Sequence, residues 1–190
     1  MDVEDTYGQL VWYSANTCSE NIRIILPGKQ CRSKFRTQFE LCIDLASVEL
    51  GAGGGLVGLA VAVGCKVDTT LHITDQEEMF ELMKKNIALN NLSSRVAASV
   101  YDWGQPTPSG LPQYPDIILA ADCVYFEPAF PLLQKTLKDI IGPNTVCYFC
   151  FKRRRRADLT FMKTAGKMFD VREVDDDPDK GIWSKERVFL

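Results

Sequence analysis

From about residue 46 the chain alternates short apolar runs with longer segments whose apolar positions recur at helical spacing. The short runs are β-branched or apolar and predict strands at 46–50, 70–75, 95–101, 116–122 and 145–151. The longer segments predict helices at 55–64, 76–90, 128–141 and 157–169. This alternation is typical of βαβ units, so we predict an α/β fold with a Rossmann-like, doubly wound, mostly parallel sheet.

The two ends of the chain carry weaker patterns. Residues 170–175 and 184–190 predict closing strands. In the middle of the chain, 105–115 is rich in proline and predicts an irregular loop. Near the start, 14–26 could form a helix and 27–39 reads as a polar, basic loop. We expect a single domain over 1–190, with 1–45 as a short N-terminal extension.

The composition limits the cellular compartment and the binding partners that the chain can have. The chain has 190 residues and a net charge of −3, so the whole molecule has no general attraction for nucleic acid or membranes. It has no apolar run long enough to span a bilayer, and its start is acidic and polar, unlike a secretion signal. Seven cysteines, an odd number, lie in apolar segments and predict reduced thiols. We therefore expect a cytoplasmic protein and, with no heptad pattern, a monomer.

Metal and histidine chemistry are disfavoured. Cys147 and Cys150 form a C-x-x-C, but it lies in a strand-like run without a second ligand pair, so we expect core packing. His72 is the only histidine, which excludes a multi-histidine metal site. We predict no metal.

The most informative motif is a glycine-rich turn. Gly53, Gly55 and Gly58 form G-x-G-x-x-G between a predicted strand and a predicted helix, which is the context that the motif requires. Asp75 ends the next strand, twenty residues after Gly55, where an acid can accept hydrogen bonds from ribose hydroxyls. The pattern predicts an adenosine-containing ligand at the carboxyl ends of the strands.

Glu49 helps to distinguish between the adenosine-containing ligands that such a turn can bind. A dinucleotide would place a pyrophosphate at the helix N-terminus, and a carboxylate just before the turn would oppose it. The same carboxylate would suit the cationic methionine end of S-adenosylmethionine.

These residues resemble the seven-strand methyltransferase class, whose first motif matches Glu49-Leu50-Gly51-Ala52-Gly53. More narrowly, ELGAGGGLVGL, ITD, YDWG and LAADCVY together resemble protein-lysine methyltransferases that modify elongation factors and chaperones, and most closely the fungal branch acting on elongation factor 1-alpha. The similarity runs from about residue 46 to 150. Its implied cofactor is S-adenosyl-L-methionine, and its implied partner is a protein substrate.

The resemblance also implies residue roles. Cofactor-contacting positions are Trp12, Glu49, Gly51, Ala52, Gly53, Asp75, Asp102, Trp103 and Ala121. Asp122 and Tyr125, in the D-x-x-Y after the fourth strand, are the candidate catalytic pair. We expect Asp122 to accept a hydrogen bond from the incoming amine and Tyr125 to wall the lysine channel. The alternatives are a helix-capping role for Asp122 and core packing for Tyr125.

The run Lys152-Arg153-Arg154-Arg155-Arg156 admits two interpretations: a solvated loop, or a docking surface for an acidic protein or RNA. Three other functions remain open at this point. They are a small-molecule or nucleic-acid methyltransferase, a dinucleotide-binding dehydrogenase, and a non-catalytic binding module. The dehydrogenase is disfavoured by Glu49, whose carboxylate would oppose the pyrophosphate of a dinucleotide.

Overall fold

The structure is a computed structural model that describes residues 45–65, 69–173, 185 and 188–189. The expectations for residues 14–26 and 27–39, and Trp12, lie outside the described residues. The described body contains the predicted strand-helix alternation from residue 46 onward.

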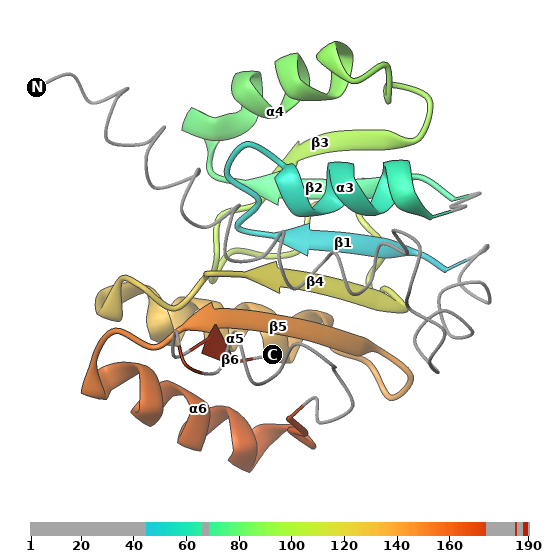
Figure 1. The fold of residues 1–190 in the computed structure, drawn as a ribbon. Coiled ribbons are helices and arrows are strands. Elements are labelled where there is room, and N and C mark those ends of the chain that lie inside the picture. Colours follow the sequence, from blue (N-terminus) through green and yellow to red (C-terminus); the bar gives the residue numbers. More distant parts are fainter. Residues whose placement is uncertain (1–44, 66–68, 174–184, 186–187, 190) are drawn as a thin grey trace, which may run out of the picture.

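A six-stranded sheet forms the centre of the described part, in the order β3-β2-β1-β4-β5-β6. Its strands are β1 (Ser47–Leu50), β2 (Leu71–Asp75), β3 (Val96–Val100), β4 (Ile117–Ala121), β5 (Val146–Lys152) and β6 (Val188–Phe189). Strands β1 to β5 run parallel, and β6 pairs antiparallel with β5 at the edge (Figure 1). The predicted Rossmann-like, mostly parallel sheet is confirmed.

Helices cover both faces of this sheet. They are α3 (Leu56–Gly64), α4 (Glu77–Leu89), α5 (Phe130–Ile140) and α6 (Arg156–Met168), with a short 3-10 helix η1 (Glu127–Ala129) before α5. In Figure 1, α3 lies in front of the sheet and α5 behind it.

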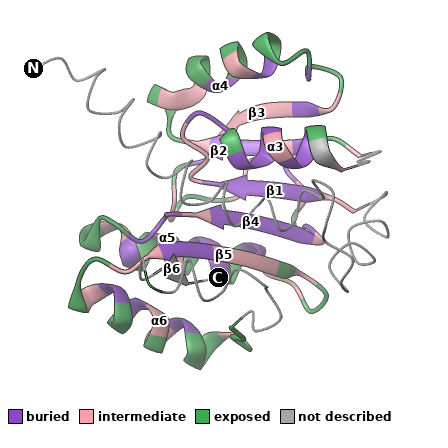
Figure 2. Ribbon diagram, viewed as in Figure 1, coloured by how far each residue is buried: buried purple, intermediate pink, exposed green. Residues whose placement is uncertain are grey.

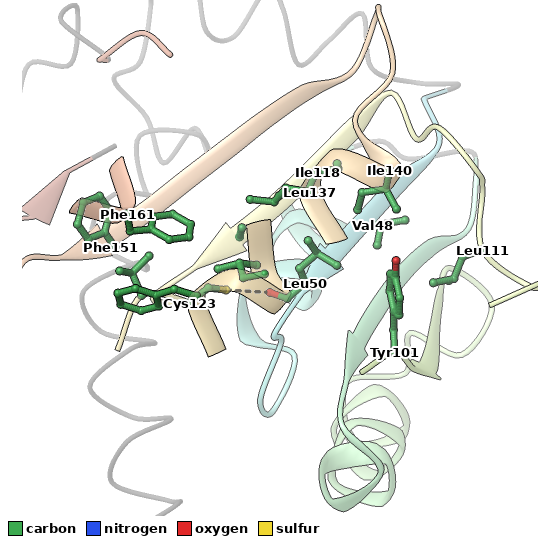
Figure 3. Packing of buried hydrophobic residues seen from close by; sticks show 14 residues of the cluster. Val48, Leu50, Tyr101, Leu111, Ile118, Cys123, Leu137, Ile140, Phe151 and Phe161 are labelled. Atoms are coloured by element: carbon green, nitrogen blue, oxygen red, sulfur yellow. Dashed lines mark hydrogen bonds between the residues drawn. The ribbon is translucent and has the colours of Figure 1, made fainter. Parts of the chain in front are cut away.

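The core is split between the two faces. Alternate residues of β4 point to opposite sides, so Ile117 and Leu119 pack with α3 and α4, whereas Ile118 and Ala120 pack with α5 and α6. Figure 2 shows β1 buried along its length and β4 buried except at its last residue, and Figure 3 shows the α5 and α6 side of the core. As predicted, the fourth strand is central and buried.

Two predicted elements need correction. The expected strand at 170–175 is absent from residues 170–173. These residues are all exposed, so none of their side chains packs into the core as one face of a strand would. The single helix expected over 128–141 is divided into η1 and α5. Pro131 has no N–H to donate to the Glu127 carbonyl, so the α-helix cannot extend back through that turn.

The core-packing prediction is confirmed for the C-x-x-C: Cys150 is buried in one core cluster, and Cys147 packs against the other. Burial raises the pKa of Cys147 to about 12, which keeps this thiol protonated at neutral pH. Within the described ranges, no three His, Cys, Asp or Glu side chains gather as metal ligands would. No described helix has both the length and the apolar character needed to cross a bilayer.

Candidate active site

The candidate site lies where the strand order reverses. From β1 the chain builds β2 and β3 on one side, then crosses over to place β4 on the other side of β1. Leu50 pairs with Ala120 on β4 and with Thr74 on β2, so the residues that follow these strands meet at one edge. Open α/β sheets bind ligands in the crevice at such a switch point.

The glycine turn occupies this edge. Gly51 has φ +60°, and a Cβ placed there would lie 2.8 Å from Cζ2 of the Trp103 ring and 3.0 Å from the Cys123 sulfur. Only glycine meets both demands, the left-handed backbone and the close approach of an aromatic ring. The Cys123 Sγ also contacts the Leu50 carbonyl oxygen at 3.3 Å (Figure 3).

Asp75 lies at the end of β2 and closes the turn from the side. Its Oδ2 accepts a hydrogen bond from the Gly53 N–H at 2.7 Å, and its Oδ1 accepts one from the Gln76 N–H at 2.7 Å. An ionised carboxylate has roughly four lone-pair directions, so acceptor capacity remains for hydroxyl groups of a ligand. Asn86 of α4 steadies the turn by donating to the Gly54 carbonyl at 2.8 Å.

Glu49 lies beneath the first turn of α3. Its side chain is fully buried, and Oε2 accepts a hydrogen bond from the Gly58 N–H at 2.8 Å. Burial raises the pKa of Glu49 from its ordinary 4.5 to about 8, and the nearby Asp75 adds to the rise. This carboxyl group therefore takes up a helix N–H that a pyrophosphate would need. Its contact with the methionine end of the cofactor stays a prediction.

Acidic groups cluster around the turn. Burial raises the pKa of Asp75, and the neighbouring Asp102 and Glu78 carboxylates raise it further, against the two backbone hydrogen bonds that lower it. Such a site disfavours an anionic ligand and favours one that carries hydroxyls and positive charge. The preference for a positively charged ligand therefore rests on Asp75 and its acidic neighbours, because Glu49 keeps its proton up to about pH 8 and adds no negative charge at neutral pH.

Three more of the predicted cofactor residues lie at the carboxyl ends of β3 and β4. Asp102 and Trp103 follow β3, whose Val100 pairs with Asp75, and the Trp103 ring is half-buried against Gly51. The next residue, Gly104, donates its N–H to Thr136 of α5 at 2.8 Å, which ties this loop to the helix. Ala121 ends β4 beside Asp122. Trp12 lies outside the described residues.

Asp122 and Tyr125 lie on the loop after β4, next to the turn. Asp122 is buried and has φ +54°, a conformation that is uncommon for a residue other than glycine. The cap of η1 is Phe126, without a side-chain hydrogen bond, so the helix-capping alternative for Asp122 is wrong. Tyr125 is 51 % exposed, so the core-packing alternative for it is also wrong.

The partner of Asp122 was not predicted from the sequence. Both Asp122 oxygens accept hydrogen bonds from Arg154, Oδ1 from Nη1 at 2.7 Å and Oδ2 from Nη2 at 2.8 Å. Arg154 belongs to the basic run that was interpreted as a solvated loop or a docking surface; it is exposed in the loop before α6, and its side chain also pairs with the buried Asp122, which neither interpretation included. The basic run follows the strand beside β4, and only that adjacency could have signalled the pairing.

The residues at this edge fit S-adenosylmethionine. Asp75 offers free acceptor capacity for ribose hydroxyls, the missing Cβ of Gly51 lets the Trp103 ring pack against the turn, and the acidic surroundings suit a sulfonium and an ammonium group. Fold and site together define the class of Rossmann-like methyltransferases that use this cofactor.

Solved structures support the fold assignment. An O-methyltransferase family 2 protein from Planctomyces limnophilus superposes with a TM-score of 0.59 at 15% identity, covering 92% of this chain and 58% of that one. A candidate S-adenosyl-L-methionine-dependent methyltransferase from Methanococcus maripaludis gives 0.57 at 14% identity, covering 95% and 75%. At these identities the likeness establishes the fold alone.

The particular family follows from the sequence comparisons. Residues 1–168 match the lysine methyltransferase family, and the chain belongs to that family. Membership implies S-adenosyl-L-methionine as the cofactor.

Among its relatives, the protein-lysine N-methyltransferase EFM6 of Saccharomyces cerevisiae is 39% identical over 158 residues, covering 75% of this chain and 64% of the yeast protein. EEF1A lysine methyltransferase 3 of Mus musculus is 33% identical over 138 residues, covering 71% and 58%. The chain thus spans less than two thirds of the length of these relatives.

Proposed function

We propose that this chain is a protein-lysine N-methyltransferase that transfers a methyl group from S-adenosylmethionine to a lysine of elongation factor 1-alpha in the cytoplasm. The observation that carries the proposal is the juxtaposition of two features at the switch point. One is the acidic glycine turn with Asp75, and the other is the Asp122–Tyr125 loop beside it. Family membership supports the reaction, and the name of the mouse relative supports the substrate.

The chemistry asks for an uncharged amine. Bound S-adenosylmethionine supplies an electrophilic methyl carbon on a sulfonium, so the protein supplies position and electrostatics. A lysine has a pKa near 10.4, so only about one in a thousand is neutral near pH 7.4. Low polarity and a nearby positive charge both lower that pKa.

Asp122 and Tyr125 would handle the acceptor lysine. Asp122 is held at the mouth of the switch point with both oxygens engaged by Arg154, and an ionised carboxylate retains lone pairs for an amine N–H. The exposed ring of Tyr125 lies on the same loop, three residues further on, where an aliphatic lysine stem could pack along it. We assign orientation of the amine to Asp122 and the channel wall to Tyr125.

The test is methyl transfer by the full chain. Labelled S-adenosylmethionine is added with purified elongation factor 1-alpha, and separately with an extract of cells that lack this gene. We expect one labelled band at elongation factor 1-alpha, and mass spectrometry should place the methyl group on a lysine.

Asp122→Ala should abolish the band while calorimetry still shows binding of S-adenosylhomocysteine. If the label appears in another protein, the proposed substrate is wrong but the proposed reaction, lysine methylation, stands. Label only in small molecules or nucleic acid would replace the acceptor class. Cofactor binding without transfer to any acceptor would favour a non-catalytic binding module.

A further inference from the structure

The loop that carries Asp122 is held by hydrogen bonds to β5 and to the segment that follows β5. Asp122 donates its N–H to the Cys150 carbonyl at 2.7 Å, which aligns the end of β4 with β5. Arg154 then emerges just after β5 and reaches back with both terminal nitrogens to the two oxygens of Asp122. Two parallel hydrogen bonds fix the carboxylate in plane and rotation, which a single contact would leave free.

The Asp122 end of this pairing is sheltered from solvent. The Asp122 side chain is 7% exposed and that of Arg154 is 35% exposed, so water competes little for the carboxylate. The left-handed backbone of Asp122 also needs external support, because a residue with a Cβ does not adopt it readily. Arg154 supplies that support from 32 residues away in the sequence.

A buried acid in turn holds the arginines. Asp158, in the first turn of α6, is completely buried, and its Oδ2 accepts hydrogen bonds from the backbone N–H groups of Arg154 and Arg155, both at 2.8 Å. Arg155 donates through Nη2 to the carbonyl oxygen of Tyr125. The first and last residues of the D-x-x-Y loop are therefore tied to adjacent arginines whose backbone is set by one carboxylate.

We infer that Arg154 and Arg155 are positioning residues for methyl transfer, which hold Asp122 and Tyr125 in place from the start of α6. This inference rests on the proposed function. Arg154 acts through Asp122: it leaves about two lone-pair directions of the carboxylate for the substrate amine and fixes where they point. Lysine cannot replace it, because an ammonium group does not make the planar two-point contact.

The experiment uses Arg154→Met and Arg154→Lys in the full chain, with Arg156→Met as the matched control. Arg156 is exposed, belongs to the same basic run, and makes no side-chain hydrogen bond or ion pair recorded among the described residues. We expect Arg154→Met to lower kcat by about 10- to 100-fold, with KM for S-adenosylmethionine and its affinity unchanged. Arg154→Lys should recover little, and Arg156→Met should behave like the wild type.

A double variant separates positioning from a direct role. If Arg154 acts only through Asp122, then Asp122→Asn with Arg154→Met should be no slower than Asp122→Asn alone. Losses that multiply in the double variant, or a full recovery in Arg154→Lys, would overturn the inference. An equal loss in Arg156→Met would do the same, since it would indicate a general charge effect.

Amide hydrogen exchange on the protein without substrate gives a readout independent of catalysis. Arg154→Met should speed exchange over residues 122–125 while leaving the α4 amides unchanged. If the wild type transfers no methyl group but exchange over residues 122–125 is faster in Arg154→Met, the proposed function is wrong, whereas the positioning of this loop by Arg154 is supported. If exchange over 122–125 is unaffected, the inference fails whatever the activity.

Discussion

The Glu49 carboxyl group lies directly beneath α3 and accepts a hydrogen bond from the Gly58 backbone N–H at 2.8 Å. Gly58 has no Cβ, and one placed there would lie 2.7 Å from Glu49 Oε2 and 2.5 Å from Ile73 Cγ2. The helix can therefore approach β1 closely only because residue 58 is glycine, and the carboxyl group satisfies an N–H at the start of the helix.

The raised pKa of Glu49 predicts a pH-dependent stability. The folded state holds this proton up to about pH 8, whereas the unfolded chain releases it near 4.5. The stability from this group is thus complete below about pH 4.5 and is lost as pH rises toward 8. By linkage the loss amounts to at most about 5 kcal/mol. Glu49→Gln should remove it, so urea unfolding at pH 5 and pH 8.5 should show wild type losing more stability than the variant. Parallel losses would contradict the assignment.

The contact between Gly51 and Trp103 predicts that Gly51→Ala weakens cofactor binding. The new Cβ would lie 2.8 Å from the Trp103 ring, and an L residue at φ +60° costs about 1–2 kcal/mol. We expect roughly a tenfold or larger loss of S-adenosylhomocysteine affinity by calorimetry. Gly110→Ala is the control, because a Cβ at Gly110 meets nothing within 4 Å. Equal affinity in the two variants would show that the Gly51 turn is remote from the ligand.

Asp75→Asn should weaken cofactor binding because the amide keeps only one acceptor oxygen for the Gly53 N–H and any ribose hydroxyls. A hydrogen bond to a charged group contributes about 1.5–3 kcal/mol, so we expect roughly a 10- to 100-fold loss of affinity. Asp139→Asn is the matched control, since Asp139 is an exposed acid of α5 paired with Lys135 at 2.7 Å. Binding that is unchanged in Asp75→Asn would remove this residue from the cofactor site.

Gly166→Ala should stabilise the protein without touching the site. Gly166 is an exposed residue inside α6, and a Cβ there meets nothing within 4 Å. Glycine in a helix interior costs about 0.5–1 kcal/mol relative to alanine. The melting temperature should therefore rise by roughly 1–4 °C, with kcat unchanged. A fall in melting temperature would mean that α6 is packed differently at this position.

The sequence by itself determined the succession of strands and helices along the chain, the glycine turn, and the acid at the end of the second strand. Those features depend on residues close together in the chain: hydrophobic period, turn glycines, and the spacing from Gly55 to Asp75. The split of the predicted helix 128–141 was also readable in principle, because Pro131 acts locally.

Only the tertiary structure decided how Asp122 is held and where Glu49 points. The bond between Asp122 and Arg154 spans 32 residues and exists because β4 and β5 are neighbours in the sheet. The burial of Glu49 likewise depends on α3 packing across β1 and β2. A basic run looks the same in sequence whether it faces water or a buried carboxylate, since its environment is set by strand order and not by its own pattern.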